Sequence, residues 1–365
     1  MTARGLAFLV ALFSGSACAD RFDEWDKNKD GKLQKEELPA WLRGNFGRAD
    51  TDRDGVISRE EDASFLKRRS SSGRPDVVAG GDAFRVVKDL DYAGSGNPRQ
   101  ALDLFLPRQA AAKPRPLLVF IHGGAWRSGS KEGGLRRLLP FLQSGDYAGA
   151  ALNYRLSAEA RWPAQIHDCK AAIRWLKAHA GEYGYDAGRI AAWGDSAGGH
   201  LVAMLGVSGD VPELEGTLGR HLDQDSKVTC VVDFFGPANL LTMDDHPSKI
   251  KHGAAGSPEG ALVGGALADR KETARSASPV THVSRVDAPV LIAHGTEDML
   301  VPYMQSVEFA KVLREAHVPV VLITMEGAGH GFRSEELQRR ITAFLGRHLR
   351  GTKAPLSDRR IPKGE

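Results

Sequence analysis

Cysteine is scarce in this chain of 365 residues, which contains three, and only Cys169 and Cys230 lie beyond the amino-terminal stretch. Two cysteines are too few to frame a fold with disulfides, and the sequence leaves open whether they form one bridge or stay as thiols.

Net charge is also small, because 49 basic and 46 acidic residues give +3. So small a balance gives no electrostatic argument for nucleic acid or an acidic membrane, and we expect neither partner.

Long apolar runs are absent apart from one short stretch, GLAFLVALF, near the amino terminus. It follows Arg4, is too short to cross a bilayer, and precedes small residues ending in Ala17-Cys18-Ala19. These features are typical of a cleavable signal peptide. We therefore expect a signal peptide over residues 1–19, a secreted or periplasmic location, and no membrane span. An ordinary helix and a lipid anchor on Cys18 are the alternatives.

Beyond that stretch, composition divides the chain into further parts. Residues 20–68 are acidic loops with short helical pieces, and residues 69–82 are rich in Ser, Gly and Pro and predict a linker. In residues 83–350, continuous apolar runs alternate with amphipathic stretches, after a leading hairpin formed by FRVVKDLDY and ALDLFLP. This alternation predicts the α/β class, with a mostly parallel, doubly wound sheet. Residues 351–365 are polar and predict a flexible tail.

Two stretches, DKNKDGKLQKEE and DTDRDGVISREE, share one pattern of oxygen-bearing residues. A hard dication takes six or seven oxygens, and such loops supply them from positions 1, 3, 5, 7, 9 and 12, with glycine at position 6. Two matches in tandem make a plain acidic loop the weaker interpretation. The expected Ca²⁺ ligands are Asp26, Asn28, Asp30, the Lys32 carbonyl, Gln34 and Glu37, then Asp50, Asp52, Asp54, the Val56 carbonyl, Ser58 and Glu61.

These loops resemble tandem EF-hands over about residues 20–66. The segment between them, LPAWLRGNFGRA, is short and interrupted by Pro39 and two glycines, so a calmodulin-like opening is not expected. Leu33 and Ile57 are apolar at position 8, as expected if the loops pair by a short backbone bridge. We interpret this part as a small, closed, all-α module in which calcium has a structural role.

A separate motif, Gly194 to Gly198, has the pattern G-x-S-x-G. In a chain with 41 glycines the pattern alone is weak, but here it follows an apolar strand, RIAAW, and precedes a helical run, GGHLVAML. A strand, tight turn and helix hold a serine hydroxyl above the sheet, with glycines where a Cβ would clash. Ser196 is therefore the candidate nucleophile.

A serine hydroxyl needs a base that takes its proton, and the base needs a carboxylate that orients it. Of the three histidines nearest the carboxyl terminus, two lie in helical patterns and His330 lies in a glycine-rich loop, GAGHGF. Asp298 follows the strand PVLIAHG, at the carboxyl end of the sheet, with Glu297 as its only close rival. The resulting chain order, Ser196, Asp298, His330, is that of an α/β-hydrolase.

An oxyanion intermediate needs fixed hydrogen-bond donors. The loop IHGGAW offers the backbone N–H groups of Gly123, Gly124 and Ala125, and Ala197 adds another directly after the nucleophile.

Other polar and aromatic residues near these motifs are interpreted as structural and not as catalytic. We expect structural imidazoles at His122 and His294, a backbone-bonding carboxylate at Asp195, and either a pocket-lining or a packing role for Trp126.

From about residue 84 to 349 the chain resembles an α/β-hydrolase of the hormone-sensitive-lipase-like and feruloyl/acetylxylan-esterase-like (BD-FAE-like) group. HGGAW, GDSAGGH, SPVTHV, HGTEDMLVP and GAGHGF appear in the family's order and spacing. The resemblance implies carboxylester hydrolysis through an acyl-serine, no metal in the chemistry, and a pocket shaped by residues 208–226 and 238–285. Ala125 replaces the third glycine of HGGG, while His200 resembles the carbohydrate-esterase branch. We expect a small-molecule or carbohydrate-linked ester as substrate.

Two other functions stay open. The chain could be a calcium-dependent binding or docking protein whose hydrolase domain is inactive, although the complete triad and oxyanion motif argue against this. It could also cleave amides, as peptidases and formamidases of similar fold do, because acyl transfer to water uses the same residues. The sequence indicates neither the acyl and alcohol groups nor the oligomeric state.

Overall fold

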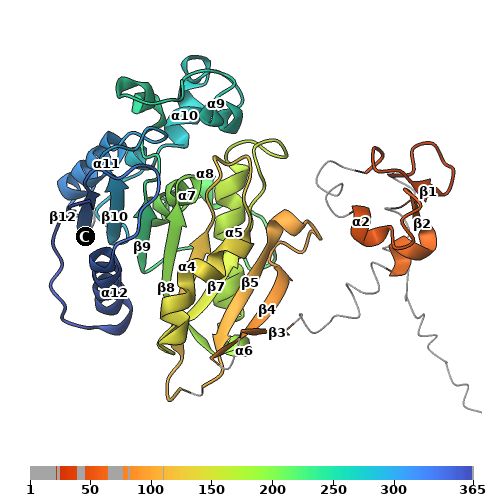
Figure 1. The fold of residues 1–365 in the computed structure, drawn as a ribbon, viewed down its shortest axis with the longest axis horizontal. Helices are drawn as coiled ribbons and strands as arrows, with labels where there is room; N and C mark the ends of the chain where they lie inside the picture. Colours follow the sequence, from red (N-terminus) through yellow and green to blue (C-terminus); the bar gives the residue numbers. More distant parts are fainter. Residues whose placement is uncertain are drawn as a thin grey trace, which may run out of the picture. The chain divides into compact units, whose positions relative to one another are not determined.

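The computed structural model describes residue 22 and residues 25–38, 46–64, 77–80, 83–109 and 111–363. The chain divides into two compact units, Met1–Arg74 and Pro75–Glu365, which Figure 1 shows in sequence colours. The predicted signal peptide, residues 1–19, lies outside the described residues.

The first unit contains the two acidic loops. Strand β1 (Lys32–Leu33) pairs antiparallel with β2 (Ile57–Ser58), with Leu33 opposite Ile57, which confirms the expected backbone bridge. A short helix, α2 (Phe46–Ala49), precedes the second loop. The unit has its own small core, made of Phe22, Leu33, Leu38, Phe46, Ala49 and Ile57.

The second unit is built on one large sheet, in which the described strands follow the order β12-β11-β10-β9-β8-β6-β7-β5-β4-β3. Strands β12 to β7 in this order are parallel, and β5, β4 and β3 continue the sheet with antiparallel pairing. The predicted α/β class and the leading β4–β5 hairpin are confirmed. The bounds are β3 Val77–Gly80, β4 Phe84–Asp91, β5 Ala101–Pro107, β6 Arg115–Ile121, β7 Ala148–Leu152, β8 Tyr185–Asp195, β9 Cys230–Phe234, β10 Val290–Gly295, β11 Val320–Met325 and β12 Arg359–Ile361.

Helices cover both faces of this sheet (Figure 1). The side chains of β6 alternate: Val119 belongs to the core layer that includes helices α5, α7 and α11, while Phe120 belongs to the layer that includes α4 and α12. Strands buried on both faces therefore have near-continuous apolar sequences. The helices are α4 Gly134–Gln143, α5 Ala164–Ala178, α6 Ala180–Tyr183, α7 Ala197–Val207, α8 Pro212–Glu215, α9 Pro258–Val263, α10 Lys271–Ser276, α11 Met304–Glu315 and α12 Glu335–Arg350.

Two segments expected to lack regular structure contribute edge strands. Residues 69–82 were predicted as a linker, but Val77–Gly80 form β3 and pair antiparallel with β4. Residues 351–365 were predicted as a flexible tail, but Arg359–Ile361 form β12, parallel to β11, and Ile361 is fully buried. In both places a very short segment forms a strand because it pairs with the free edge of the sheet, although the residues around it are polar.

The two remaining cysteines are free and buried. Cys169 packs in the core layer of α5 and Cys230 in the layer of α4, on opposite faces of the sheet, so the geometry excludes a bridge between them. No helix in the described part of the chain is long and apolar enough to span a bilayer.

Candidate active site

Ser196 occupies a sharp turn between β8 and α7, with φ +57° and ψ −122°. A residue with a side chain rarely adopts this conformation, so the surrounding structure must hold it there. The flanking glycines explain how the turn closes. A Cβ on Gly194 would lie 2.2 Å from the Gly198 carbonyl oxygen, and one on Gly198 would lie 2.1 Å from the carbonyl oxygen of Ile121. Gly194 and Gly198 lack the side chains that would otherwise prevent Ser196 from adopting this strained conformation.

The three residues expected to form a triad come together after the carboxyl ends of three parallel strands. Ser196 Oγ lies 3.0 Å from His330 Nε2, and His330 Nδ1 lies 2.6 Å from Asp298 Oδ2. With the Nδ1 proton donated to the carboxylate, Nε2 is left to accept the serine proton. The arrangement can therefore act as a nucleophile, a base and an orienting acid.

Asp298 is held by four hydrogen bonds. Its Oδ1 accepts from the amides of Leu300 and Val301, at 2.8 and 3.0 Å, and its Oδ2 accepts from His330 and from His294, the latter at 3.2 Å. Burial alone would raise the pKa of Asp298, but the hydrogen bonds from His294 and His330 and their attraction hold it well below its usual range. The carboxylate therefore stays ionised opposite the base.

His294 was expected to be a satisfied structural imidazole, and it is satisfied. Its Nδ1 accepts from the Ser306 hydroxyl at 2.7 Å, and its Nε2 also faces the Val301 carbonyl oxygen at 2.9 Å. Its contact with the acid of the triad was missed. The available signal was spacing, since His294 ends β10 four residues before Asp298.

The expected oxyanion donors lie against the serine turn. A Cβ on Gly123 would lie 2.6 Å from the Asp195 carbonyl oxygen and 3.2 Å from the Ser196 Cβ. Gly124 and Ala125 follow with φ of +111° and +56°. Within the described residues, the amides of Gly123, Gly124 and Ala125 donate no backbone hydrogen bond. Ala197 begins α7. These amides are therefore free to bind a ligand oxygen.

Two aromatic residues near the loop have structural roles. Trp126 is 1% exposed, and its Nε1 donates to His200 Nδ1 at 3.2 Å, so it packs rather than lining a pocket. His200 Nε2 in turn donates to the Ala277 carbonyl oxygen at 2.6 Å, tying α7 to the insertion over residues 238–285. Burial lowers the pKa of His200 to about 4, which keeps the imidazole neutral.

His122 and Asp195 flank the loop and the nucleophile. His122 stacks on Tyr154, with ring centroids 4.4 Å apart, and its Nδ1 lies 2.7 Å from the Gly123 carbonyl oxygen, as a structural imidazole does. The expectation that Asp195 bonds neighbouring backbone is wrong, because its carboxylate forms an ion pair with Arg137 of α4. Sequence could not give this contact, since the partners are 58 residues apart.

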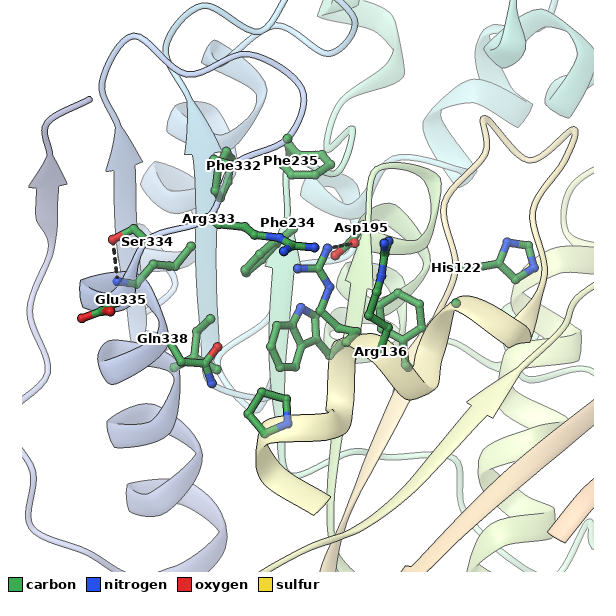
Figure 2. Close-up of a pocket in the computed structure, with 18 residues that line it drawn as sticks. His122, Arg136, Asp195, Phe234, Phe235, Phe332, Arg333, Ser334, Glu335 and Gln338 are labelled. Atoms are coloured by element: carbon green, nitrogen blue, oxygen red, sulfur yellow. Dashed lines mark hydrogen bonds and ion pairs between the residues drawn. The ribbon is translucent and has the colours of Figure 1, made fainter. Parts of the chain in front are cut away.

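A cavity of about 1070 Å³ is lined by the residues drawn in Figure 2, two of which adjoin members of the triad in sequence. Asp195 and Gly331, which line it, adjoin the nucleophile and the base, and the ring of Phe235 lies 4.5 Å from that of His330. Aromatic and arginine side chains form most of the remaining wall. The lining residues from α4 and α12 and the loops beside them include Arg136, Arg137, Phe332, Arg333, Ser334, Glu335 and Gln338.

The acidic loops of the first unit have closely similar geometry. In each, the amide of the position 6 glycine donates to the first aspartate: Gly31 to Asp26 at 2.9 Å and Gly55 to Asp50 at 3.2 Å. Both glycines have positive φ, +79° and +89°, which explains the residue type. Glu37 accepts from the amides of Lys27 and Gln34, and Glu61 from those of Thr51 and Ser58, so the position 12 residue closes each loop.

The second loop fits a cation best. Carboxylate oxygens of Asp50, Asp52 and Asp54 lie within 4.8 Å of one another, and Asp50 Oδ1 is buried without a hydrogen-bond partner among the described residues. The backbone amide of Ser58, helped by that of Thr51, lowers the pKa of Glu61 to about 2. Converging anionic oxygens, one of them buried and unpartnered, are what a hard dication requires.

Comparisons with known proteins agree with this architecture. Residues 102–313 match the sequence model of the BD-FAE family, and residues 19–39 and 45–61 match that of the EF hand. The chain is 34% identical over 338 residues to "Probable carboxylic ester hydrolase LipM" of Mycobacterium tuberculosis, covering 90% of this chain and 73% of that one. It is 32% identical over 237 residues to "Esterase LipC" of the same organism, covering 65% of this chain but 58% of that one.

Solved structures give the same likeness. A "Truncated form of carbohydrate esterase from gut microbiota" matches with a TM-score of 0.66 and 30% identity, covering 75% of this chain and all (100%) of that one. A "Bifunctional GH43-CE" of Bacteroides eggerthii matches with a TM-score of 0.67 and 31% identity, covering 72% of this chain and 38% of that one.

Proposed function

The chain belongs to the BD-FAE family, and from this premise we propose that it is a serine carboxylesterase that acts through an acyl-serine intermediate on Ser196. The observation that carries the proposal is the hydrogen-bonded line from Ser196 through His330 to Asp298, at 3.0 and 2.6 Å. The unpartnered amides of Gly124 and Ala125 beside it support the same chemistry. The esterase names of the curated relatives agree with it.

In the proposed reaction, His330 Nε2 takes the Ser196 proton as Oγ attacks the ester carbonyl carbon. The backbone amides of Gly124, Ala125 and Ala197 hold the resulting oxyanion. His330 then gives its proton to the leaving alcohol, and a water, activated by the same imidazole, releases the acid from the serine. Asp298 stays ionised throughout and balances the imidazolium.

For the substrate, we propose ester groups carried by carbohydrates, such as acetyl or feruloyl side chains of polysaccharides. The likeness to two carbohydrate-esterase structures supports this, and so does the wide cavity beside the triad. In the sequence, His200 lies shortly after the serine turn and also resembles the carbohydrate-esterase branch of the family. Comparing rates on acetylated, feruloylated and aliphatic esters tests the assignment.

We also propose that Ca²⁺ binds both acidic loops and that residues 1–19 direct export. The converging oxygens of Asp50, Asp52 and Asp54 support the first proposal, and the short apolar run supports the second. Bound calcium would supply positive charge that allows these carboxylates to approach one another. Neither loop contributes a residue to the triad, so we assign calcium a stabilising role.

A fluorophosphonate probe tests the central proposal, because it modifies only a serine whose proton a neighbouring base can take. We expect stoichiometric labelling, located at Ser196 by mass spectrometry of the digested protein. A docking protein with an inactive hydrolase domain would stay unlabelled. Rates on matched ester and anilide substrates with the same acyl group separate ester from amide hydrolysis, and we expect the ester to be cleaved faster.

A further inference from the structure

The cavity beside the triad concentrates positive charge at one place. Arg136 and Arg137 come from α4, and Arg333 comes from the loop that follows His330. Figure 2 shows the Arg333 side chain extending across the cavity toward Asp195, with Arg136 on the other side of that carboxylate. Arg137 pairs with Asp195 directly.

The acidic groups of this cavity do not balance its arginines. Asp195 is already paired with Arg137, and no described residue forms an ion pair or hydrogen bond with the guanidinium of Arg136 or Arg333. Within the described part of the chain, the only other acidic lining residue is Glu335, whose carboxylate lies away from Asp195 in Figure 2 and pairs with Arg339 at 3.8 Å. The guanidinium groups of Arg136 and Arg333 thus lack an ion-pair or hydrogen-bond partner among the described residues, and Asp195, which also attracts Arg136, is a single negative charge beside three arginines.

Uncharged side chains add a second, independent sign of a polar ligand. The indole Nε1 of Trp193, which lines the same cavity, is buried and lacks a hydrogen-bond acceptor among the described residues. Leaving a buried donor without an acceptor costs free energy, so such groups usually meet a ligand or a water. Two buried acceptors of the same cavity, Asp195 Oδ1 and His122 Nε2, also lack a partner among the described residues. A ligand that carries both hydroxyl groups and acceptor oxygens, as a sugar does, could satisfy all three atoms.

The position of the cavity assigns it to one half of an ester. His330 must lie beside the leaving alcohol, because it gives its proton to that oxygen. The chain that continues from His330, through Gly331 and Phe332 to Arg333, forms one wall. The rings of Phe235 and Phe332, 5.4 Å apart at their centroids, form an apolar surface between the base and the arginines.

On this basis we propose that the cavity binds the alcohol part of the substrate as an acidic sugar, with a uronic acid carboxylate between Arg136 and Arg333 and the sugar ring against Phe235 and Phe332. This inference rests on the proposed esterase function and narrows its substrate to esters on uronate-containing saccharides. The bond cleaved is still the acyl C–O bond, the proton from His330 goes to the sugar oxygen, and water supplies the hydroxyl of the released acid.

The test compares kcat/KM on two acetylated oligosaccharides of equal length, one of galacturonate and one of neutral xylose, for the full-length protein. We expect the acidic substrate to be preferred, and the preference to fall as ionic strength rises. In Arg333→Gln and Arg136→Gln the ratio of acidic to neutral kcat/KM should fall by about 10-fold each, mostly through KM, as expected for an exposed charged contact. Arg333→Lys should retain part of the preference.

Arg108→Gln is the matched control, because Arg108 is exposed and follows β5, which runs antiparallel to β7 and so ends at the opposite edge of the sheet. It changes net charge equally and should leave the ratio unaltered. An equal rate on both saccharides, an unaltered ratio in both arginine variants, or a preference for an acidic acyl group such as hemisuccinate would overturn the proposal. Hydrolysis of p-nitrophenyl acetate, measured in parallel, shows whether the esterase function itself holds.

Discussion

His294 donates from Nε2 to Asp298 Oδ2 at 3.2 Å, and this is the oxygen that also accepts from His330 at 2.6 Å. The acid of the triad is therefore fixed from two sides by imidazoles that differ in exposure. His294 is fully buried between Asp298 and Ser306, whereas the His330 side chain is 19% exposed. A carboxylate fixed in this way keeps one oxygen aimed at the base, which sets the tautomer that serine activation requires.

We expect His294→Ala to lower kcat on p-nitrophenyl acetate by about 10-fold, since it removes a hydrogen bond to a charged group. With one donor gone, Asp298 attracts the imidazolium of His330 more strongly, so the acidic limb of the kcat/KM profile should move to higher pH. His294→Gln keeps a donor near the Nε2 position and should recover part of the activity. A fall in kcat with an unmoved acidic limb would indicate that His294 only packs.

The triad itself gives the largest expected losses. Ser196→Ala should lower kcat on p-nitrophenyl acetate by at least about 10⁴-fold and abolish fluorophosphonate labelling. Asp298→Asn should cost roughly 10⁴-fold, because the amide favours the wrong imidazole tautomer. Thermal unfolding of each variant provides the control for folding. Undiminished turnover in folded Ser196→Ala would end the acyl-serine proposal.

The loop that carries the oxyanion donors is sensitive to a single methyl group. In Gly123→Ala the new Cβ would meet the Asp195 carbonyl oxygen at 2.6 Å, so loop and serine turn must separate. We expect kcat to fall by about 10²- to 10³-fold, the usual cost of a displaced oxyanion donor, with KM changing less. Gly181→Ala is the matched control, because a Cβ there meets nothing within 4 Å. Equal kcat in the two variants would contradict the assignment.

Motifs with short-range geometry were predictable from sequence, and long-range partners were not. The G-x-S-x-G turn and the calcium loops carry their own glycines and ligands, so they are visible within a few residues of chain. The chain order of an α/β sheet was enough to bring Asp298 and His330 to the right edge. Continuous apolar runs also predicted strands, because strands buried on both faces are apolar throughout, and amphipathic stretches between them predicted helices.

The features missed depend on contacts that no local pattern encodes. Arg136 and Arg137 are ordinary polar positions in the amphipathic sequence of α4, and only the folded sheet brings Asp195 and Arg333 beside them. Likewise β12 has just three residues, and its pairing with β11 depends on an edge that exists only after folding. The structure is therefore most informative about contacts between residues that are far apart in sequence, such as the ion pair of Arg137 with Asp195.

A buried carboxyl next to the serine turn gives a prediction for stability against pH. Asp233 is 1% exposed, and burial raises its pKa to about 7, although the Gly236 amide donates to it at 2.9 Å. A folded-state pKa above the unfolded value of about 3.9 means that the stabilising contribution is present below that value and is lost as pH rises toward 7.

Asp233→Asn cannot ionise and retains an acceptor for the Gly236 amide. We therefore expect it to be more stable than the parent by a few kcal/mol at pH 8, since each pKa unit corresponds to about 1.4 kcal/mol, and nearly equal near pH 4. Urea unfolding at several pH values measures the difference. The exposed Asp245→Asn is the control and should show no such trend. A stability difference that does not vary with pH would contradict the assignment.

Calcium should act on the first unit and leave the chemistry of the second intact. If each loop binds with a dissociation constant on the order of 10⁻⁴ M, 10 mM Ca²⁺ raises the free energy of unfolding of that unit by about 2.7 kcal/mol for each of the two loops. Glu61→Gln removes the residue that closes the second loop, through amides of Thr51 and Ser58, and should remove much of this gain. Glu60→Gln, an exposed neighbour outside the ligand positions, should keep it.

Terbium luminescence excited through tryptophan provides a direct readout of the loops, because Trp25 immediately precedes Asp26. We expect saturable luminescence that Ca²⁺ displaces and that Glu61→Gln weakens. The rate on p-nitrophenyl acetate should change by less than about twofold on chelation, because the triad is built entirely from the second unit. A loss of turnover on chelation as large as that caused by Ser196→Ala would mean that the ion serves catalysis, and the stabilising role would have to be abandoned.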